Sequence, residues 1–222
     1  MEIYKDNNIV KIGGKVVIEP EFSHELFDEK FYIFYIETKR LSDYTDELPV
    51  IVSERLIDIS KIKNGIIYEI YGQFRSYNKV TNGKSKLVLS IFAKELKEVN
   101  DENILTLNDS TFVGFICKKP IYRKTPLGRE IADALIAVNR SYKKSDYIPC
   151  ILWGRNAKFC ETLPIGSMVK LNGRIQSRKY EKKNEDGTVI SKVAYEVSIS
   201  RFSVAESNEN IDEKKEENLV VE

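Results

Sequence analysis

Hydrophobic and polar residues alternate in many short segments of the chain, and these segments are rich in β-branched and aromatic residues. A period of two and this composition are typical of β-strands that bury one face. Strands are therefore predicted at residues 31–36, 48–52, 66–71, 87–92, 111–116, 134–138, 147–153, 168–175 and 194–199.

A helical spacing occurs once in each half of the chain. Residues 53–62 and 156–163 place hydrophobic residues three or four positions apart, and a glycine follows each segment, at Gly65 and Gly166. Residues at this spacing share one face of a helix, and glycine is a usual helix stop. One short helix is therefore expected in each half.

Two polar stretches, residues 76–86 and 178–192, interrupt the hydrophobic pattern at equivalent places. Each contains a glycine that follows Asn or Asp, at Gly83 and Gly187, which is a strong signal for a hairpin turn. We expect these stretches to be hairpin loops, each joining the last two strands of its half.

The same landmark residues occur twice, about one hundred positions apart. The pairs are Gly14 and Gly114, Pro20 and Pro120, Arg40 and Arg140, Asp46 and Asp146, Pro49 and Pro149, Gly65 and Gly166, and Gly72 and Gly173. Glycine and proline mark backbone positions that other residues fill badly. Their recurrence indicates two copies of one domain, residues 1–103 and residues 104–204.

Each copy orders its elements as three strands, one helix and two strands, which is the order of the OB-fold, a five-stranded Greek-key barrel. Another small barrel or a sandwich is the alternative. The fold class predicted is all-β: two tandem OB-fold barrels, each with one short helix between its third and fourth strands. Residues 205–222 are acidic and lack aromatic residues, so a disordered tail is expected there.

Charge divides the two copies. Residues 1–103 hold 15 Lys and Arg against 18 Asp and Glu, a net charge of −3, whereas residues 104–204 hold 18 against 9, a net charge of +9. The tail, residues 205–222, has a net charge of −5. A basic domain with a separate acidic tail suggests a polyanionic partner for that domain.

Signals for catalysis, cofactors and membranes are weak. The single histidine, His24, stands in a polar context, and Gly83-Lys84-Ser85 is no phosphate-binding loop, because Asn78 occupies the place of the required first glycine. No metal-type cluster, membrane span or signal peptide is found in the sequence. The three cysteines suit a reducing compartment. We therefore expect a cytoplasmic protein with no catalytic residue, no metal and no cofactor.

Cations and aromatic residues share faces of the predicted strands in the second copy. Alternation puts Tyr147, Ile151 and Trp153 on one face of their strand, opposite a hydrophobic face. In the next strand it groups one set of residues on the exposed face in the same way: Arg174, Gln176, Arg178 and Tyr180. Single-stranded nucleic acid offers a charged backbone and unstacked bases, so a generic binder needs both cations and aromatic faces. The alternative is that these aromatic residues pack the barrel and the lysines only confer solubility.

Residues 139–159, Gly166 and residues 171–180 carry a resemblance to a known family. This pattern resembles the bacterial single-stranded DNA-binding protein family, specifically over residues 108–204 and more loosely over residues 8–97. The resemblance implies that bases stack on four aromatic residues, Tyr142, Tyr147, Trp153 and Tyr180. We expect phosphate contacts from Arg140, Lys143, Arg155, Arg174 and Arg178.

The first copy lacks the stacking residues: the corresponding positions hold Ser42, Glu47, Ser53 and Lys79. Its expected main role is therefore oligomerisation or partner binding. Tyr44, Tyr77 and Arg75 lie nearby, and a shifted platform of weaker affinity formed by them is the alternative. The resemblance also implies a homodimer with four OB domains. Replication or repair proteins are candidate partners, through the first copy or through the tail, where Leu219–Val221 would replace the family's proline- and aromatic-containing tip; a purely solubilising tail is the alternative.

Two other functions remain open at this point. One is a primosome or replication-restart accessory protein that acts mainly through protein contacts. The other is a binder of single-stranded RNA, because aromatic residues on a barrel stack the bases of either nucleic acid.

Overall fold

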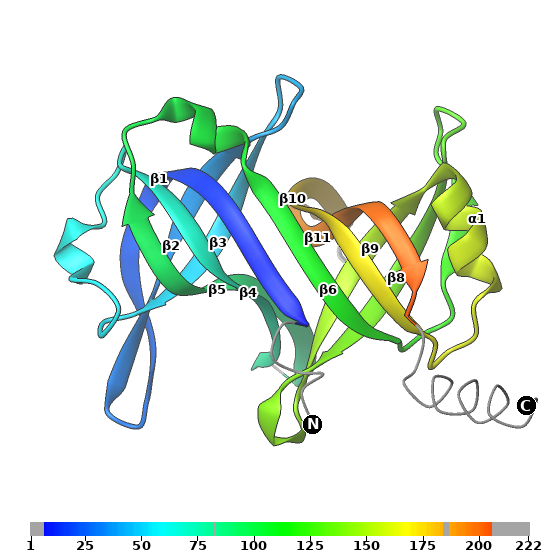
Figure 1. The fold of residues 1–222 in the computed structure, drawn as a ribbon, viewed down its shortest axis with the longest axis horizontal. Helices are drawn as coiled ribbons and strands as arrows, with labels where there is room; N and C mark the ends of the chain where they lie inside the picture. Colours follow the sequence, from blue (N-terminus) through cyan, green and yellow to red (C-terminus); the bar gives the residue numbers. More distant parts are fainter. Residues whose placement is uncertain (1–6, 82, 184–186, 206–222) are drawn as a thin grey trace, which may run out of the picture.

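The computed structural model describes residues 7–81, 83–183 and 187–205, and it contains two β-barrels side by side (Figure 1). The first copy consists of β1 Asn8–Leu26, β2 Glu29–Lys39, β3 Thr45–Ser53, the 3₁₀ turn η1 Ile59–Lys61, β4 Ile67–Thr81 and β5 Lys84–Glu98. The 3₁₀ helix η2 Glu102–Thr106 connects it to the second copy. The second copy consists of β6 Asn108–Ile116, β7 Ile121–Lys124, β8 Glu130–Asn139, η3 Ser141–Lys143, β9 Ser145–Trp153, α1 Gly154–Thr162, β10 Met168–Lys183 and β11 Val189–Val204.

Both copies close in the same way. In the first, antiparallel pairs join β3, β2, β1, β4 and β5 in turn, and a parallel pair between β3 and β5 closes the ring. In the second, β8, β6, β10, β11 and β9 form the corresponding ring, again with one parallel pair. Two tandem five-stranded OB barrels are thus confirmed.

The barrels are joined by antiparallel pairing of β1 with β6, which makes one sheet of eleven strands. Val10 pairs with Ser110, Asn8 with Phe112, and Ile12 with Asn108. Since positions 10 and 110 are equivalent in the repeat, a local two-fold axis passes through the Val10–Ser110 pair. The two copies therefore meet through the same surface of each barrel, as in an isologous dimer.

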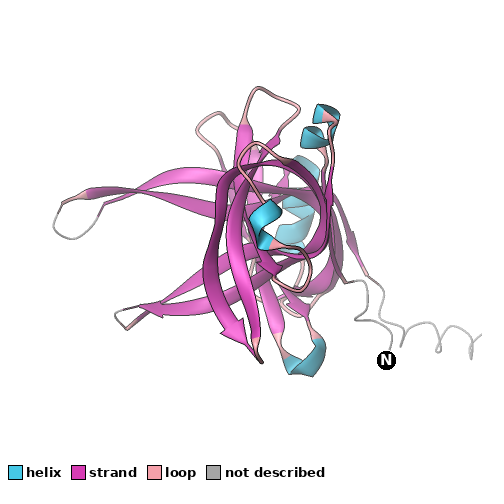
Figure 2. Ribbon diagram, turned by 90° about the vertical axis from the view of Figure 1, so that its left-hand side faces the viewer, coloured by secondary structure: helices cyan, strands magenta, loops and turns pink. Residues whose placement is uncertain are grey.

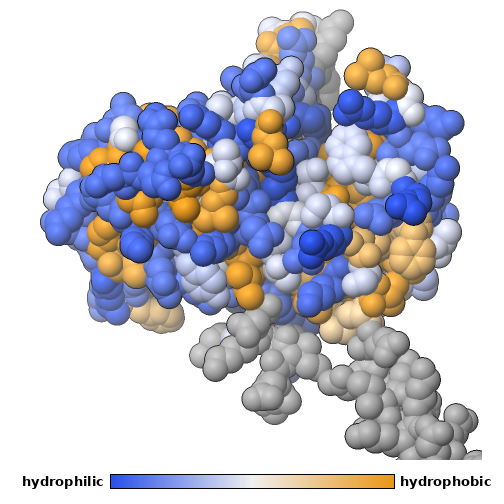
Figure 3. Space-filling view, turned by 45° about the horizontal axis from the view of Figure 1, so that its top comes forward, coloured by the Kyte–Doolittle hydropathy of each residue, from blue (hydrophilic) through white to orange (hydrophobic). Residues whose placement is uncertain are grey.

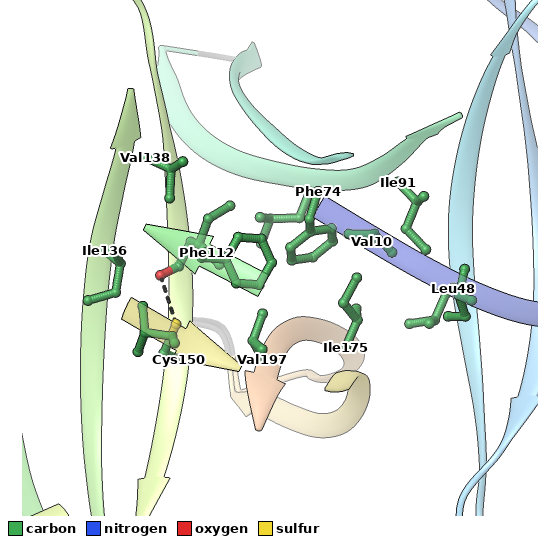
Figure 4. Close-up of a cluster of buried hydrophobic side chains, with 14 of the residues drawn as sticks. Val10, Leu48, Phe74, Ile91, Phe112, Ile136, Val138, Cys150, Ile175 and Val197 are labelled. Atoms are coloured by element: carbon green, nitrogen blue, oxygen red, sulfur yellow. Dashed lines mark hydrogen bonds between the residues drawn. The ribbon is translucent and has the colours of Figure 1, made fainter. Parts of the chain in front are cut away.

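One continuous cluster of buried side chains fills both barrels. Strand alternation supplies it, for example through Ile136 and Val138 in β8 and through Ile148 and Cys150 in β9. In Figure 4, Phe74 of the first copy lies close to the residues of the second copy at the centre of this cluster. The two barrels therefore share a core.

The helix predicted in the first copy is wrong. Residues 53–62 contain only the 3₁₀ turn η1, where the side chain of Asp58 accepts a hydrogen bond from the backbone N–H of Ser60 at 3.0 Å. Short polar side chains that bond the local backbone compete with α-helix, and β-branched residues such as Ile57 and Ile59 add little helix propensity. The helix predicted in the second copy is confirmed as α1, which buries Ala157 and Cys160.

The expected hairpin loops are mostly strand. Pairing of β4 with β5 continues to Thr81 and Lys84, and pairing of β10 with β11 continues to Lys183 and Val189. The resulting two-stranded ribbons project from the barrels (Figure 2). Both faces of such a ribbon meet water, so polar residues occupy it without the alternation that marks a half-buried strand.

No helix in the described part of the chain is long and apolar enough to span a bilayer. Hydrophilic residues predominate on the face drawn in Figure 3, where hydrophobic residues form small separate patches. The predicted acidic tail beyond residue 205 lies outside the described residues.

Candidate nucleic-acid interface

Strand β9 presents two aromatic side chains on the outer face of the second barrel. Tyr147 is 40% exposed and Trp153 is 37% exposed, whereas Ile148 and Leu152 between them are fully buried. The indole N–H of Trp153 donates a hydrogen bond of 3.0 Å to the hydroxyl of Ser198 in β11. This bond fixes the edge of the ring and leaves its faces available for stacking.

The ribbon of β10 and β11 adds a third aromatic residue, which has a cation beside it. Tyr180 is 37% exposed, and the guanidinium of Arg178 lies 5.8 Å from the centre of its ring. Arg178 also lies 3.6 Å from the carboxylate of Glu196, whose oxygen accepts a hydrogen bond from the side chain of Gln176. The prediction that Gln176 shares the exposed face is wrong, because it is buried with this partner.

Two more of the cations predicted to contact phosphates, Lys143 and Arg155, flank β9. Lys143 ends the turn η3, which also contains Tyr142, and has a positive φ of 56°. Arg155 stands in the first turn of α1, two residues after Trp153. Both side chains are exposed, so cations lie at either end of the strand that carries Tyr147 and Trp153.

Arg140 occupies a different environment from these exposed cations. Its guanidinium lies 3.0 Å from the carboxylate of Asp146, which is fully buried, and it donates a hydrogen bond of 3.1 Å to the carbonyl of Ser76 in the first copy. Asp146 in turn accepts a hydrogen bond of 2.6 Å from the backbone N–H of Ser76. Burial raises the pKa of Asp146, although Ser76 and Arg140 act in the opposite direction.

The reciprocal contact exists on the other side of the two-fold axis. Asp46 of the first copy accepts two hydrogen bonds from Arg40, at 2.9 and 2.7 Å, and one of 2.7 Å from the backbone N–H of Ser177 in the second copy. Arg40 also donates to the carbonyl of Ser177 at 3.1 Å. Arg174 completes the group at 3.2 Å from Asp46, and burial lowers the pKa of Arg174.

Each Arg–Asp pair therefore holds the backbone of the opposite copy. The sequence contained a signal for this role, because the pairs Arg40–Asp46 and Arg140–Asp146 recur at the same spacing even though the aromatic positions do not. Nothing in the sequence indicated Ser76 and Ser177 as their partners.

The model of the single-strand binding protein family matches residues 107–205, which are the second copy. Single-stranded DNA-binding protein B of Bacillus subtilis is 39% identical over an alignment covering 36% of this chain and 75% of that protein. The chain belongs to the single-strand binding protein family.

A second relative from this family, the single-stranded DNA-binding protein of Lactiplantibacillus plantarum, is 34% identical, with 46% of this chain and 52% of that protein covered. The crystal structure of the Thermus aquaticus single-stranded DNA-binding protein matches the whole fold, with a TM-score of 0.73 and 15% identity. That match covers 90% of this chain and 93% of the other, so it includes both barrels.

Members of this family are DNA-binding proteins without enzymatic activity, which confirms the prediction that the chain is not an enzyme. In the described residues, no group of three or more His, Cys, Asp and Glu side chains could hold a metal ion.

Proposed function

We propose that this protein binds single-stranded DNA without sequence preference, in replication, recombination and repair. Bases would stack on Tyr147, Trp153 and Tyr180, with Tyr142 as the fourth position that the family resemblance implies. Lys143, Arg155 and Arg178 would contact phosphates. The observation that carries the proposal is the exposed pair Tyr147 and Trp153 on the outer face of β9, in a copy with a net charge of +9.

For Arg140 and Arg174 we propose a role other than the phosphate contacts expected from the sequence. Both guanidinium groups are paired with buried carboxylates between the copies. We assign them the role of holding the two barrels together, and a phosphate contact by either would be additional to that role.

Stacking of one base on an exposed aromatic ring contributes roughly 1–3 kcal/mol. Trp153 is the only tryptophan, so its fluorescence reports on one site. Oligo(dT) is expected to quench this fluorescence. Its affinity for the protein should fall as the salt concentration rises, because binding releases counterions. Absence of quenching at low salt would refute the stacking role of Trp153.

The same titration with the matching RNA distinguishes the two nucleic acids. DNA binding is expected to be the tighter, and tighter binding of RNA would replace the proposal by single-stranded RNA binding. Tyr147→Ala removes one stacking ring and therefore about 1 kcal/mol or more of binding free energy. Since about 1.4 kcal/mol corresponds to a factor of ten, the DNA affinity should fall by a factor of five or more. The control is Tyr44→Ala, an exposed tyrosine of the first copy.

We further propose that the chain forms a homodimer with four OB domains, as the family resemblance implies, and that it acts at the nucleoid. Light scattering should then give a mass of twice the chain's 25.6 kDa. A mass of 25.6 kDa at the concentrations used for DNA binding would refute the dimer.

A further inference from the structure

One hairpin in each copy projects from its barrel, and the two hairpins are equivalent in the repeat. The first, residues 18–30, joins β1 to β2, and the second, residues 118–130, contains β7 and the turn to β8. In Figure 1 the first projects at the lower left and the second at the upper right. The two tips therefore lie at opposite corners of the molecule and point away from each other.

The two hairpins have opposite net charges of equal size. Residues 18–30 contain five acidic residues and one lysine, a net charge of −4, whereas residues 118–130 contain five Lys or Arg and one Glu, a net charge of +4. The sign is reversed at three equivalent pairs of positions, which are Glu19 and Lys119, Glu29 and Arg129, and Lys30 and Glu130. We call residues 18–30 the acidic hairpin and residues 118–130 the basic hairpin.

Several charges near the two tips have no intramolecular ion pair. In the part of the chain that the structure describes, no ion pair is formed by Glu21, Glu25 or Asp28 of the acidic hairpin, nor by Lys124 or Arg129 of the basic hairpin. All five side chains are exposed. At physiological salt their charge acts over a Debye length of about 8 Å, so a partner that uses these charges must come into contact with the hairpin.

Each hairpin also presents a large hydrophobic side chain at its tip. Phe27 is 88% exposed and Leu127, at the equivalent position, is 85% exposed. Phe22 and Ile121 add exposed hydrophobic surface to the strands. Hydrophobic residues rimmed by charged residues are typical of surfaces that bind another protein. Phe27 has a positive φ of 51°, which glycine adopts more easily, so the acidic hairpin holds this ring at its tip despite a backbone cost.

The basic hairpin of a second molecule has the chemistry that fits the acidic hairpin. Opposite charges surround hydrophobic tips on both, so a contact would bury Phe27 with Leu127 while the charges attract. A nucleic acid does not fit the acidic hairpin, because its phosphates are repelled there. Two identical copies would carry hairpins of like charge, so the complementarity arises from the divergence of the two copies in this chain.

We propose that the acidic hairpin of one molecule binds the basic hairpin of another molecule of the same chain. The two surfaces in contact differ, so the contact is heterologous, and each bound molecule offers its second hairpin to the next one. Molecules therefore assemble head to tail. This contact goes beyond the proposed DNA binding, because it joins proteins and forms without DNA, and it is additional to the proposed homodimer.

Sedimentation velocity of the DNA-free full chain, combined with charge reversal, tests the contact. At low salt the weight-average mass of the wild-type protein should at least double between dilute and concentrated samples, and high salt should reverse this increase. The acidic hairpin is made basic by three substitutions, Glu21→Lys, Glu25→Lys and Asp28→Lys. The basic hairpin is made acidic by three others, Lys119→Glu, Lys124→Glu and Arg129→Glu.

Neither triple variant should associate on its own, since its two hairpins have like charge, whereas an equimolar mixture should regain at least half of the wild-type increase. A structural role of these residues within one molecule predicts no such rescue. The control Asp43→Lys, Glu47→Lys changes two exposed acidic residues outside the hairpins and should associate as the wild type does. A constant mass of the wild type at low salt, or a mixture no heavier than either variant, would overturn the proposed contact.

Replacement of Phe27 separates the contact from folding. Phe27→Gly relieves the positive φ, so the midpoint of urea unfolding should not fall, while loss of the ring should weaken association at least threefold. Leu41→Ala is the control, because Leu41 is 96% exposed outside both hairpins, and it should leave association unchanged. Equal association of the two variants would overturn the contact between the tips.

DNA binding is measured separately, through quenching of Trp153 by a short oligo(dT). If the wild type is quenched but never associates, the proposed contact is overturned and the proposed function stands. If it associates but is not quenched, the stacking role of Trp153 is refuted and the contact stands.

Discussion

Replacement of Asp46 by alanine should destabilise the protein more than any other single change of a charged residue in the first copy. The Asp46 carboxylate is fully buried and accepts hydrogen bonds from Arg40, from Arg174 and from the backbone N–H of Ser177. Alanine would leave two guanidinium groups and one backbone donor without their shared acceptor, at the contact between the two copies.

The magnitude follows from these contacts. Removal of one partner of a buried ion pair costs about 3–5 kcal/mol, because the other charge remains buried. The side chains of Arg40 and Arg174 are 28% and 26% exposed, so water can reach them in part, which favours the lower end. A loss of about 3 kcal/mol is therefore expected, a large share of the roughly 5–15 kcal/mol that stabilises a typical domain.

Urea unfolding followed by circular dichroism measures this loss. With a denaturant dependence of about 2–3 kcal/mol per molar, the midpoint should fall by about 1 M or more. Asp43→Ala is the matched control, because Asp43 is exposed three positions earlier, in the loop that precedes β3, and it should change stability by less than about 0.5 kcal/mol. If Asp46→Ala unfolds at the same urea concentration as Asp43→Ala, the ion pair does not stabilise the contact between the copies and the reasoning is refuted.

Three further predictions concern other parts of the molecule. Asn108→Ala should cost about 2 kcal/mol in urea unfolding, since the Asn108 amide bonds both an N–H and a carbonyl of β10, at 2.9 and 2.8 Å, and these groups would lose their partners. Burial raises the pKa of all three thiols, to about 11 for Cys160, but Cys117 is only half-buried whereas Cys150 and Cys160 are buried. At pH 8 a thiol reagent should therefore label only Cys117 in the folded protein and all three cysteines in urea; rapid labelling of all three before unfolding would contradict the buried positions. Arg155→Ala should reduce the slope of log affinity for oligo(dT) against log salt by about 0.7, and an unchanged slope would show that Arg155 contacts no phosphate.

Much of the fold could be predicted because its signals are local. Alternation of polar and hydrophobic residues depends only on which face of a strand is buried, and it correctly separated Tyr147 and Trp153 from Ile148 and Leu152. Ile151, predicted on the outer face by the same alternation, is buried. The repeat of glycines and prolines depends only on backbone geometry. Gly173 illustrates this, because a Cβ there would lie against the backbone carbonyl of Ser198.

The remaining features depend on pairings between distant strands, which no local pattern contains. The hydrogen bonds of Ser76 and Ser177 exist because β1 pairs with β6 and brings each ribbon against the other barrel. The first helix was predicted from spacing alone, and the hydrogen bond from Ser60 to Asp58 outweighed that spacing. Of the shifted platform that the sequence suggested in the first copy, Arg75 and Tyr77 line one groove whereas Tyr44 does not, and the neighbouring Phe31 and Phe92 come from two other strands and share no motif with them.

The duplicated contacts explain why the two copies could diverge where they did. Asn8 bonds the backbone of Phe74 as Asn108 bonds that of Ile175, and the buried Asp46 and Asp146 hold opposite copies. A change at any of these positions costs stability, whereas a change on an exposed outer face usually costs less than about 0.5 kcal/mol.

Such divergence also shows why the net charge of a domain is a poor guide to its binding surface. At physiological salt the Debye length is about 8 Å, so a bound strand responds mainly to the charges that line its own site. The carboxylates that make the first copy acidic, such as Glu69 and Glu95, lie on its outer sheet face beside Lys11 and Lys97. A groove at the base of the β4–β5 ribbon, by contrast, has Arg75, Lys79 and Phe92 among its lining residues. The net charge of −3 therefore does not describe the local charge of every surface of the first copy.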